Sequence, residues 1–421
     1  MPELSDIACP FCGLLCDDLE VSANGNELAL SNNACAMSRR GFKEYDREFG
    51  PAKAIVNRDA KGSDEAIKHA ADILANATSP LILVANTDVA GARSSVRLAE
   101  QCGGVIDHIN SPALMRNVSV LQYSGWFTGT FAEVRNRSEI IVIVGDEIFD
   151  RYPRLIERVL LPERSLLESN LDKRKFAFIG PWNEKSLPKS LRAKKPIIID
   201  TELSRAADVI SLLRVMLSTG SINQFDIDLT LKEKLHNLFD YIKNSSYSSV
   251  IWAAGDFDFP HSDLLVQNLV EWVRSLNDKS RAIALPVGGT NGDLTLNQVC
   301  TWQSGLPIRT SFARGYPEHD LLLFDYRRLL KSGEADVLLI FGHSDLNIDI
   351  TNELDCIMVG PKDIDTEKQI FIQTGLPGLH HSGHMFRGDG VVSIPLRQIQ
   401  RTNLPSPAQV LDQISRHLDL K

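Results

Sequence analysis

Short apolar runs alternate with helical patterns along most of the chain after residue 56. The predicted strands are the apolar runs at 80–86, 140–145, 175–180, 196–200, 249–255, 281–286, 335–342, 355–360 and 369–373. Between or after them, apolar residues recur at helical spacing at 64–77, 207–217, 261–276 and 406–418. Continuous apolar runs indicate strands buried on both faces, and their alternation with helices predicts parallel α/β sheets covered by helices. The polar segments 163–175 and 218–248 are candidate surface insertions or domain boundaries.

Several of the predicted strands end in a glycine, and four of these strand ends are candidate ligand positions. The pairs are Gly145-Asp146, Gly180-Pro181, Gly255-Asp256 and Gly342-His343. In open α/β sheets, ligands bind just beyond the carboxyl ends of the strands, and a glycine there lets the backbone approach a phosphate or a purine. One such glycine more often only makes a turn, but four of them favour a large nucleotide-like ligand. No G-x-G-x-x-G follows a strand and no G-x4-G-K-[ST] is present, so a standard dinucleotide site or P-loop is not supported.

Composition and charge exclude several classes of protein. The 421 residues carry 45 Lys and Arg against 54 Asp and Glu, a net charge of −9, without a basic run. This balance argues against a nucleic-acid or membrane-surface binder. No apolar stretch approaches the roughly 18 residues of a membrane span, and the N-terminus lacks a secretory-signal pattern. We therefore expect a cytoplasmic protein of two or three domains.

Cysteine is the feature that points to chemistry. Four of the seven cysteines lie in the first 35 residues with the spacing C-x2-C-x3-C-x18-C, namely Cys9, Cys12, Cys16 and Cys35. An odd total in a chain without a secretory signal does not fit a disulfide framework. Three crowded thiolates closed by a distant fourth favour a [4Fe–4S] cluster, and a zinc ion or an empty relic site are the alternatives. We expect Cys102, Cys300 and Cys356 to be core residues.

Several segments carry a resemblance to a known family. They are CPFCGLLCDDLE with the later Cys35, GWFTGTFAEVRNRSEIIVIVGDEIFDRYPR, NQVCTWQSGLPIRTSFARGYP, ADVLLIFGHSDLNID and FIQTGLPGLHHSGHMFRGDGVVSIPLR. Together they resemble the B subunit of formylmethanofuran dehydrogenase, a family of molybdopterin oxidoreductases related to formate dehydrogenase. The resemblance covers nearly the whole chain. It implies formate dehydrogenase/DMSO reductase-like α/β domains around a bis-pterin cleft, with a small cysteine-rich β subdomain in front.

The resemblance also implies a domain organisation. It predicts an iron–sulfur-type subdomain over 1–56, a discontinuous α/β domain over 57–128 and 246–400, an α/β domain inserted at 129–245, and a C-terminal helix at 401–421. The chain stops at Lys421, so we expect the C-terminal β-barrel of larger single-chain relatives to be absent. In this arrangement Gly145, Asp146, Gly255, Gly342 and His343 are the candidate residues of a vestigial pterin cleft.

The chain departs from the family's pattern at the metal ligand. Catalytic members hold molybdenum or tungsten through a Cys or selenocysteine in a V-C-H-G-P-like loop. The segments that flank this loop correspond to 104–107 and 133–137, which places the ligand position in the loop 111–117, near Met115. No cysteine lies between Cys102 and Cys300, and a thioether cannot replace an anionic thiolate on a high-valent metal. We therefore expect metal-centred formate/CO2 chemistry to be lost, which also argues against a working molybdopterin.

A related complex without redox chemistry fits this departure. In the formyltransferase/hydrolase complex of bacterial one-carbon oxidation, the B-like subunit is a relic of the oxidoreductase, and other subunits transfer and hydrolyse the formyl group. The resemblance then implies partner subunits of the A, C and D types and a methanofuran-like carrier bound by the complex. The alternative is an active molybdenum or tungsten subunit whose metal has no protein thiolate. A stand-alone zinc-bearing nucleotide-binding protein is a third interpretation.

Arg314 and His381 are the remaining candidates for the cleft. The residues 380–384 form an H-H-x2-H pattern that could bind a metal, although no carboxylate precedes it at a helpful spacing; simple loop polarity is the alternative. In catalytic relatives an arginine of the block that holds Arg314 lines the active cleft. A surface ion pair with Glu318 or Asp320 is the alternative for Arg314.

Overall fold

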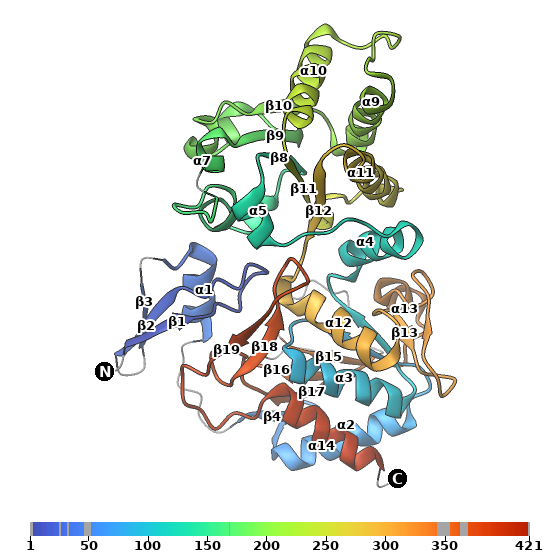
Figure 1. Cartoon of the computed structure of the whole chain (residues 1–421). Coiled ribbons are helices and arrows are strands. Elements are labelled where there is room, and N and C mark those ends of the chain that lie inside the picture. Colours follow the sequence, from blue (N-terminus) through green and yellow to red (C-terminus); the bar gives the residue numbers. More distant parts are fainter. Residues whose placement is uncertain are drawn as a thin grey trace. The chain divides into compact units, whose positions relative to one another are not determined.

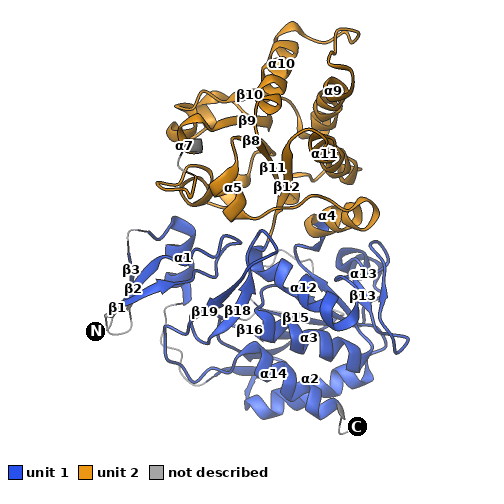
Figure 2. Cartoon of the chain, viewed as in Figure 1, with its two compact units in different colours: residues 1–112, 289–421 blue, residues 113–288 orange. Residues whose placement is uncertain are grey.

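The computed structural model describes residues 3–24, 27–31, 33–45, 52–167, 169–342, 354–362 and 369–419. The chain divides into two compact units (Figures 1 and 2). Unit 1 combines residues 1–112 with 289–421, and unit 2 is the continuous segment 113–288. Each unit is built on its own sheet with parallel strands and covering helices. The expected α/β class with parallel sheets flanked by helices is confirmed.

Unit 1 contains a nine-stranded mixed sheet in the order β14-β13-β7-β6-β15-β16-β17-β4-β5. The strands are β4 (Ala54–Val56), β5 (Asp59–Lys61), β6 (Pro80–Val84), β7 (Val105–His108), β13 (Thr310–Ser311), β14 (Glu318–His319), β15 (Val337–Phe341), β16 (Asp355–Gly360) and β17 (Gln369–Gln373). The central strands β7, β6, β15, β16 and β17 are parallel, and the outer pairs are antiparallel. Because the central strands are buried on both faces, they carry the continuous apolar runs seen in the sequence.

Helices cover both faces of this sheet. They are α2 (Ser63–Asn76), α3 (Val89–Cys102), α12 (Asp293–Ser304), α13 (Tyr326–Ser332) and α14 (Pro407–Asp419). Helix α3 packs against α12 and α14, and α14 also packs against α2 (Figure 1). On the other face, Leu329 of α13 joins a buried cluster with Leu83 of β6 and Ile340 of β15. The predicted C-terminal helix is thus part of the layer that covers this sheet.

The N-terminal residues form a small antiparallel sheet within unit 1. Its strands are β1 (Glu3–Ile7), β2 (Leu19–Asn24) and β3 (Glu27–Leu30), followed by α1 (Ala36–Tyr45). Ile7, Cys9 and Phe42 share a buried cluster with Leu376 and Leu379, which follow β17. Shortly after Leu379 in the sequence, β18 (Gly383–Phe386) and β19 (Ser393–Leu396) form an antiparallel hairpin.

Unit 2 contains a five-stranded parallel sheet in the order β10-β9-β8-β11-β12. The strands are β8 (Ile140–Val144), β9 (Lys175–Gly180), β10 (Ile197–Asp200), β11 (Tyr247–Ala253) and β12 (Arg281–Val287). The chain builds β8, β9 and β10 outward and then returns to the other side of β8. The order therefore reverses between β8 and β11, which is the topological switch point of a doubly wound sheet.

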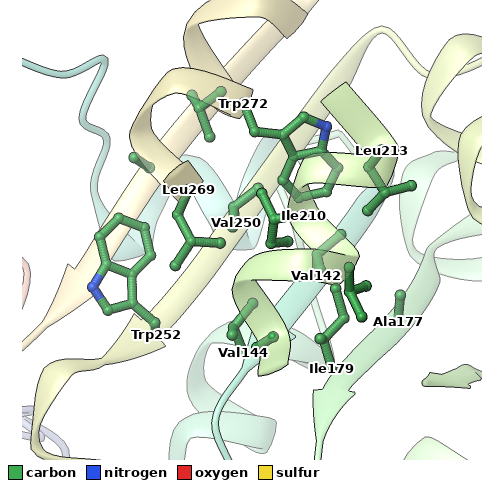
Figure 3. Close-up of a cluster of buried hydrophobic side chains, with 14 of the residues drawn as sticks. Val142, Val144, Ala177, Ile179, Ile210, Leu213, Val250, Trp252, Leu269 and Trp272 are labelled. Atoms are coloured by element: carbon green, nitrogen blue, oxygen red, sulfur yellow. The ribbon is translucent and has the colours of Figure 1, made fainter. Parts of the chain in front are cut away.

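Helical segments surround this sheet and build its core. They are α4 (Ser111–Ser124), α5 (Phe131–Arg137), α6 (Ile148–Arg151), the π-helix η1 (Ile156–Leu160), α7 (Ser169–Lys173), η2 (Glu184–Ser186), α8 (Lys189–Arg192), η3 (Leu203–Arg205), α9 (Ala206–Thr219), α10 (Leu229–Lys243), η4 (Ala254–Asp256) and α11 (Ser262–Leu276). Figure 3 shows strand residues such as Val142 and Val250 in one cluster with Leu213 of α9 and Trp272 of α11. The adjacent helices α9 and α11 thereby cover the sheet with apolar side chains.

The boundaries of the units differ from the predicted domain boundaries. The end of the inserted domain was predicted at 245, in the polar segment 218–248. That segment instead contains α10, whose exposed face is polar, and the sheet continues through β11 and β12 to Val287. The polar residues on the exposed face of a helix can therefore be mistaken for the polar residues of a domain boundary. Among the described residues, no helix is both long and apolar enough to cross a membrane.

The buried Arg174 gives a test of how unit 2 is held together. Its side chain, 1% exposed, donates from Nε to Ser138 O at 2.8 Å, from Nη1 to Leu160 O at 2.7 Å and from Nη2 to Arg135 O at 2.9 Å. Burial lowers the pKa of Arg174 to about 10. Arg174→Met leaves these carbonyls without their donors, so we expect it to lower the free energy of unfolding by about 3 kcal/mol. Urea denaturation measures the loss.

The matched control is Arg281→Met, because Arg281 is exposed at the start of β12. We expect this control to change the unfolding free energy by less than about 0.5 kcal/mol. Equal losses in the two variants would contradict the structural role of Arg174.

Candidate functional site

The carboxyl ends of the parallel strands in unit 1 bring polar groups to one edge of the sheet. Asn86 and Asp88 follow β6, and Thr374 follows β17. Gly342, which follows β15 with φ +97, packs so tightly that a Cβ would lie 1.9 Å from Asn86 O. A Cβ on Gly360 would in turn lie 2.5 Å from Gly342 O. Gly342 is therefore required for the close approach of the protein's own loops at this edge.

Several buried polar atoms at this edge have no hydrogen-bond partner within the described parts of the chain. They are Asn86 Oδ1, Asp88 Oδ2, Thr374 Oγ1 and His381 Nε2. Thr374 is fully buried and Asp88 is 4% exposed. Buried polar atoms in folded proteins are nearly always hydrogen-bonded. Such a set at the carboxyl edge of a parallel sheet therefore marks a position for a ligand or for ordered water.

The two carboxylate oxygens of Asp88 have different surroundings. Oδ1 accepts a hydrogen bond from Gly91 N–H at 2.9 Å and so caps α3, while Oδ2 lies where a Cβ on Gly383 would approach to 2.2 Å. Burial raises the pKa of Asp88, while the Gly91 N–H and the charges of His381 and His384 lower it. The carboxyl group and the histidines of the 380–384 loop therefore belong to one electrostatic neighbourhood.

A buried ionic network fixes the end of β7 beside this edge. The Arg309 guanidinium contacts Asp325 Oδ2 at 2.6 Å and Asp107 Oδ2 at 3.6 Å, and it donates to Ser111 Oγ at 3.3 Å. Tyr326 N–H donates to Asp107 Oδ2 at 3.0 Å. Burial raises the pKa of Asp107 to about 7, although Arg309 lowers it. Sheet, loop and α13 are thus joined through one cation.

His108 links the end of β7 to the turn 290–292. Asn110 N–H donates to His108 Nδ1 at 2.9 Å, so the ring proton is assigned to Nε2, which donates to Asn291 O at 3.1 Å. Burial lowers the pKa of His108 to about 4. His108 is therefore a neutral structural bridge at physiological pH.

The cysteine loop between β1 and β2 carries Cys9, Cys12 and Cys16, and the metal site expected from their spacing with Cys35 stays a prediction. Cys9 N–H donates to Cys16 O at 2.8 Å and Leu15 N–H donates to Cys12 O at 3.1 Å, which closes the loop. Cys35 precedes α1, and its Sγ accepts a hydrogen bond from Ser38 N–H at 3.4 Å. Burial raises the pKa of Cys12, and the charges of Cys9, Cys16 and Cys35 raise it further. The four thiols, none of them in a disulfide, thus lie close enough to interact electrostatically.

The donor set fits an all-thiolate site by its chemistry, while its geometry is not that of a formed metal site. In the residues that the structure describes, no three His, Cys, Asp or Glu side chains are arranged to hold a metal ion. The thiols therefore have to turn toward a common centre to bind one. Their mutual repulsion as thiolates disfavours ionisation without a cation, and a bound iron or zinc ion would remove that penalty.

The cysteine loop contacts the loops at the edge of the unit 1 sheet. Gly388 N–H donates to Gly13 O at 2.6 Å, and a Cβ on Gly289 would lie 3.3 Å from Gly13 Cα. A Cβ on Gly378 would lie 3.3 Å from Pro10 Cγ. The cysteine loop and the strand-end loops of unit 1 therefore form one continuous region.

The structure places Met115 differently from the prediction. The segment 111–117 was expected to be a loop, but it is the first half of helix α4, and Met115 is buried there at 4% exposure. The helix begins with Ser111-Pro112, a favourable start because proline fits the first helical turn, and Leu114, Met115 and Val118 give it an apolar face. The residues that follow β7 directly are Ile109 and Asn110. They lie at the strand end, where a ligand position is expected.

Gly145, Asp146 and Gly255 come together at the switch point of the unit 2 sheet. The side chains of Asp256 and Arg151 fill this position: a Cβ on Gly145 would lie 2.5 Å from Asp256 Oδ2, and one on Gly255 would lie 3.0 Å from Arg151 Cζ. Arg151 Nε contacts Asp256 Oδ1 at 2.8 Å. Burial raises the pKa of Asp146, and the neighbouring Glu147 adds to the rise.

The other predicted residues lie apart from this position. Gly342 belongs to unit 1, and His343 lies outside the described residues. Arg314 is exposed and pairs with Glu318 at 3.2 Å, as its alternative interpretation expected. His381 is half-buried near Asp88. A role for these residues in a cofactor site stays a prediction.

Sequence reasoning missed Asn86, Asp88, Thr374 and His108. The segment Asn86-Thr87-Asp88 directly follows the apolar run of β6, and a polar segment after a buried parallel strand is a usable signal. Asp88 also stands where a helix cap is expected before α3. Thr374 and His108 gave no signal, because their burial depends on residues distant in the sequence.

Comparisons with known proteins place these observations in a family context. No family model matches the chain. The chain is 22% identical to the B subunit of tungsten-containing formylmethanofuran dehydrogenase 2 of Methanococcus maripaludis, over 100% of this chain and 99% of that protein. The protein of the same name from Methanocaldococcus jannaschii is 24% identical, over 94% of this chain and 93% of its own length. The B subunit of the formyltransferase/hydrolase complex Fhc of Methylorubrum extorquens is 26% identical, over 68% of this chain and 73% of that protein.

The chain is a homologue of the B subunits of formylmethanofuran dehydrogenase and of Fhc. The resemblance inferred from the sequence is therefore confirmed. A solved structure of the formyltransferase/hydrolase complex FhcABCD from Methylorubrum extorquens, in complex with methylofuran, contains a chain that matches with a TM-score of 0.73. The match covers 87% of this chain and 99% of that chain at 22% identity. This homologue of the two B subunits therefore has an Fhc-like fold.

Asp293 gives a test of the turn that His108 holds. Its carboxyl group, 6% exposed, accepts hydrogen bonds from Gly289 N–H at 2.6 Å and from Leu294 N–H at 2.5 Å. Burial raises the pKa of Asp293 to about 7, against the lowering effect of both N–H groups. In the unfolded chain this group ionises near pH 4. The folded state therefore holds an extra proton between about pH 4 and 7, and its stability falls as the pH rises through that window.

Asp293→Asn keeps an acceptor oxygen and removes the ionisation. We expect it to stabilise the protein at pH 8 by about 3 kcal/mol and to have little effect at pH 4. Urea denaturation at both pH values measures the difference. A variant that is equally destabilised at pH 4 and pH 8 would show that Asp293 is ionised in the folded state.

Proposed function

We propose that this chain is the B subunit of a formyltransferase/hydrolase complex, without redox chemistry of its own. The observation that carries the proposal is the lack of a thiolate outside the group of Cys9, Cys12, Cys16 and Cys35. Burial raises the pKa of the remaining thiols, those of Cys102, Cys300 and Cys356, to about 12. At physiological pH these groups are neutral, and a neutral thiol is a poor ligand for a high-valent molybdenum or tungsten ion.

The surroundings of these thiols support the same conclusion. Cys300 lies on α12 with its Sγ 3.8 Å from Ser304 Oγ, and Cys356 is part of the sheet core beside Leu338. Cys102 ends α3, with its Sγ 3.8 Å from Ala99 O. Cys300 and Cys356 are therefore core residues, as we expected from the sequence, whereas Cys102 is only partly buried. The position near Met115, in contrast, offers only a thioether buried in a helix.

The partners follow from the same proposal. The Methylorubrum extorquens relative is a subunit of a complex named FhcABCD, whose structure contains methylofuran. We infer partner subunits of the A, C and D types for this chain, a methanofuran-like carrier bound by the assembled complex, and a cytoplasmic location. The net charge of −9 supports the absence of nucleic-acid and membrane partners.

The chain's own residues would then act as a structural framework. Cys9, Cys12, Cys16 and Cys35 would hold a [4Fe–4S] cluster, which when bound supplies one-electron transfer. Asn86, Asp88 and Thr374 would keep the polar lining of an ancestral cofactor cleft, filled by water or a remnant ligand. Formyl transfer and hydrolysis would belong to the partner subunits.

An active formylmethanofuran dehydrogenase subunit is the second candidate function. The specific observation in its favour is that the two relatives with tungsten in their names match 94% or more of this chain, whereas the Fhc relative matches 68%. In that case the metal would be held without a protein thiolate. The two candidates differ in metal content, and this difference makes them testable.

Metal analysis of the assembled complex decides between them. The complex is purified without oxygen, and iron, molybdenum, tungsten and pterin are measured per copy of this chain. We expect molybdenum, tungsten and pterin to be absent, together with full formyl transfer and no viologen-linked formate oxidation. Stoichiometric molybdenum or tungsten with formate-dependent viologen reduction would overturn the proposal in favour of the dehydrogenase.

A cysteine pair tests the cluster separately. Cys12→Ser should abolish bound iron, because Cys12 lies within the four-thiol group, while Cys102→Ser should leave iron unchanged. We expect formyl transfer by the assembled complex to be the same in both variants. Equal iron content in the two variants would exclude the cysteine loop as the iron site.

A further inference from the structure

We propose that unit 2 carries a binding site for a small organic acid with an apolar body, in a cavity between α9, α10 and the end of β10. The cavity has a volume of about 620 Å³, within the range of known small-molecule sites. Figure 1 shows α9 and α10 of unit 2 and the connection between them. The proposed function assigns no role to this cavity.

Apolar side chains from both helices form its walls. Leu212 and Val215 lie on one face of α9, and Leu231 lies on the facing side of α10. All three pack against the core of unit 2 and are only partly buried. Phe225, in the connection between the helices, is 42% exposed and also lines the cavity. An apolar ligand would therefore cover surface that the chain leaves open to water.

The ammonium group of Lys234 supplies one of the two positive charges of the lining, which also contains three aspartates. Lys234 shares its face of α10 with Leu231, one turn earlier, and its side chain is half-buried. Within the described parts of the chain, the structure contains no ion pair or hydrogen bond of this ammonium group. A carboxylate bound there would form a charge-assisted hydrogen bond.

The other charged groups of the lining are engaged or exposed. Arg205 faces Asp208 at 3.9 Å, and Asp228 Oδ2 accepts the Leu231 N–H at 2.9 Å as the cap of α10. Asp200 ends β10 and is exposed to solvent. Lys234 is therefore the group that best discriminates an acid from an alcohol or an amine of the same length.

The place of the cavity in the fold supports a ligand site. Asp200 and Thr201, at the carboxyl end of β10, are part of the lining. Ligands of open α/β sheets bind beyond the carboxyl ends of strands. The switch point between β8 and β11, where such a ligand is more often found, is filled by Arg151 and Asp256. The cavity beside β10 is the alternative that the sheet leaves open.

The probe for this site is octanoate, with octanol and octylammonium as ligands of matched length. Binding to the full-length protein is measured by isothermal titration calorimetry and ligand-observed NMR. We expect octanoate to bind at least about tenfold more tightly than octanol, since a hydrogen bond to a charged group contributes about 1.5–3 kcal/mol. Octylammonium should bind most weakly.

Two variants and one control locate the effect. Lys234→Met keeps the apolar stem and should weaken octanoate about tenfold without changing octanol. Lys232→Met, on the same helix outside the lining, should leave both ligands unchanged. Leu212→Trp fills the cavity and should abolish binding of both, and circular dichroism checks that each variant is folded.

The outcomes that overturn the proposal are distinct from those that bear on metal content. Octanoate that binds no better than octanol, or that binds equally to Lys234→Met and to the wild-type chain, rules out the charged site. No binding of either ligand at millimolar concentration rules out a small-molecule site and favours a partner segment in the same cavity.

Discussion

The guanidinium of Arg309 is the interaction on which the edge of the unit 1 sheet depends. A buried cation costs several kcal/mol to desolvate unless its partners surround it, and here Asp107, Asp325 and Ser111 do so from separate segments. The ion pair of Arg309 with Asp107 fixes the end of β7. His108, the next residue, then holds the turn 290–292 through its hydrogen bond to Asn291 O. The next glycine-rich contacts reach Gly13 of the cysteine loop. Polar contacts therefore join the sheet to the turn 290–292, and close backbone packing of Gly289 against Gly13 joins that turn to the cysteine loop.

The strand-end loops and the cysteine loop differ in how far they depend on a bound ligand or metal. The strand-end loops are held by protein contacts alone, such as the glycine contacts around Gly342 and the cap that Asp88 gives to α3. The thiols of the cysteine loop are different, because the charges of its neighbours raise the pKa of Cys12 and oppose its ionisation. The protein's own contacts thus fix the backbone of the strand-end edge, whereas the thiols of the cysteine loop ionise more easily beside a bound cation. Loss of redox chemistry would leave the first intact.

Much of the fold could be predicted from the sequence, and the exceptions have physical reasons. Each predicted strand is present, because runs such as 80–86 and 140–145 are apolar on both faces of a parallel strand. Strand β7 was not predicted, since it ends in Asp107-His108, a pair that is buried only because Arg309 and Asn291 supply partners from distant segments. The unit boundary after Val287 was missed because α10 carries its polar face outward. A local sequence pattern can indicate the hydrogen-bond or ion-pair partners of a residue only when those partners are close in sequence.

The candidate site was predicted in part for the same reason. The thiol spacing is a local signal, and the charges of the other three cysteines do raise the pKa of Cys12, although in the described residues no three of these thiols are arranged to hold a metal ion. The strand-ending glycines are also local, and Gly145 and Gly255 do meet at a switch point. The ligand position near Met115 was predicted from the order of the flanking segments. That order does not indicate that a helix begins at Ser111-Pro112. Asp88 and Thr374 could not be recognised as site residues from the sequence, because they lie at one edge only when strands far apart in the chain join the same sheet.

The salt bridge between Arg151 and Asp256 has a consequence for ligand access to unit 2. Asp256 has a fully buried side chain, and its partner covers Gly255, so the crevice between β8 and β11 is closed by side chains of the chain itself. A ligand that bound there would have to displace the Arg151 side chain and leave the buried Asp256 carboxylate without this partner, which is unfavourable. The same ion pair ties the segment after β11 to α6, so the protein's own side chains hold this end of the unit 2 sheet in place.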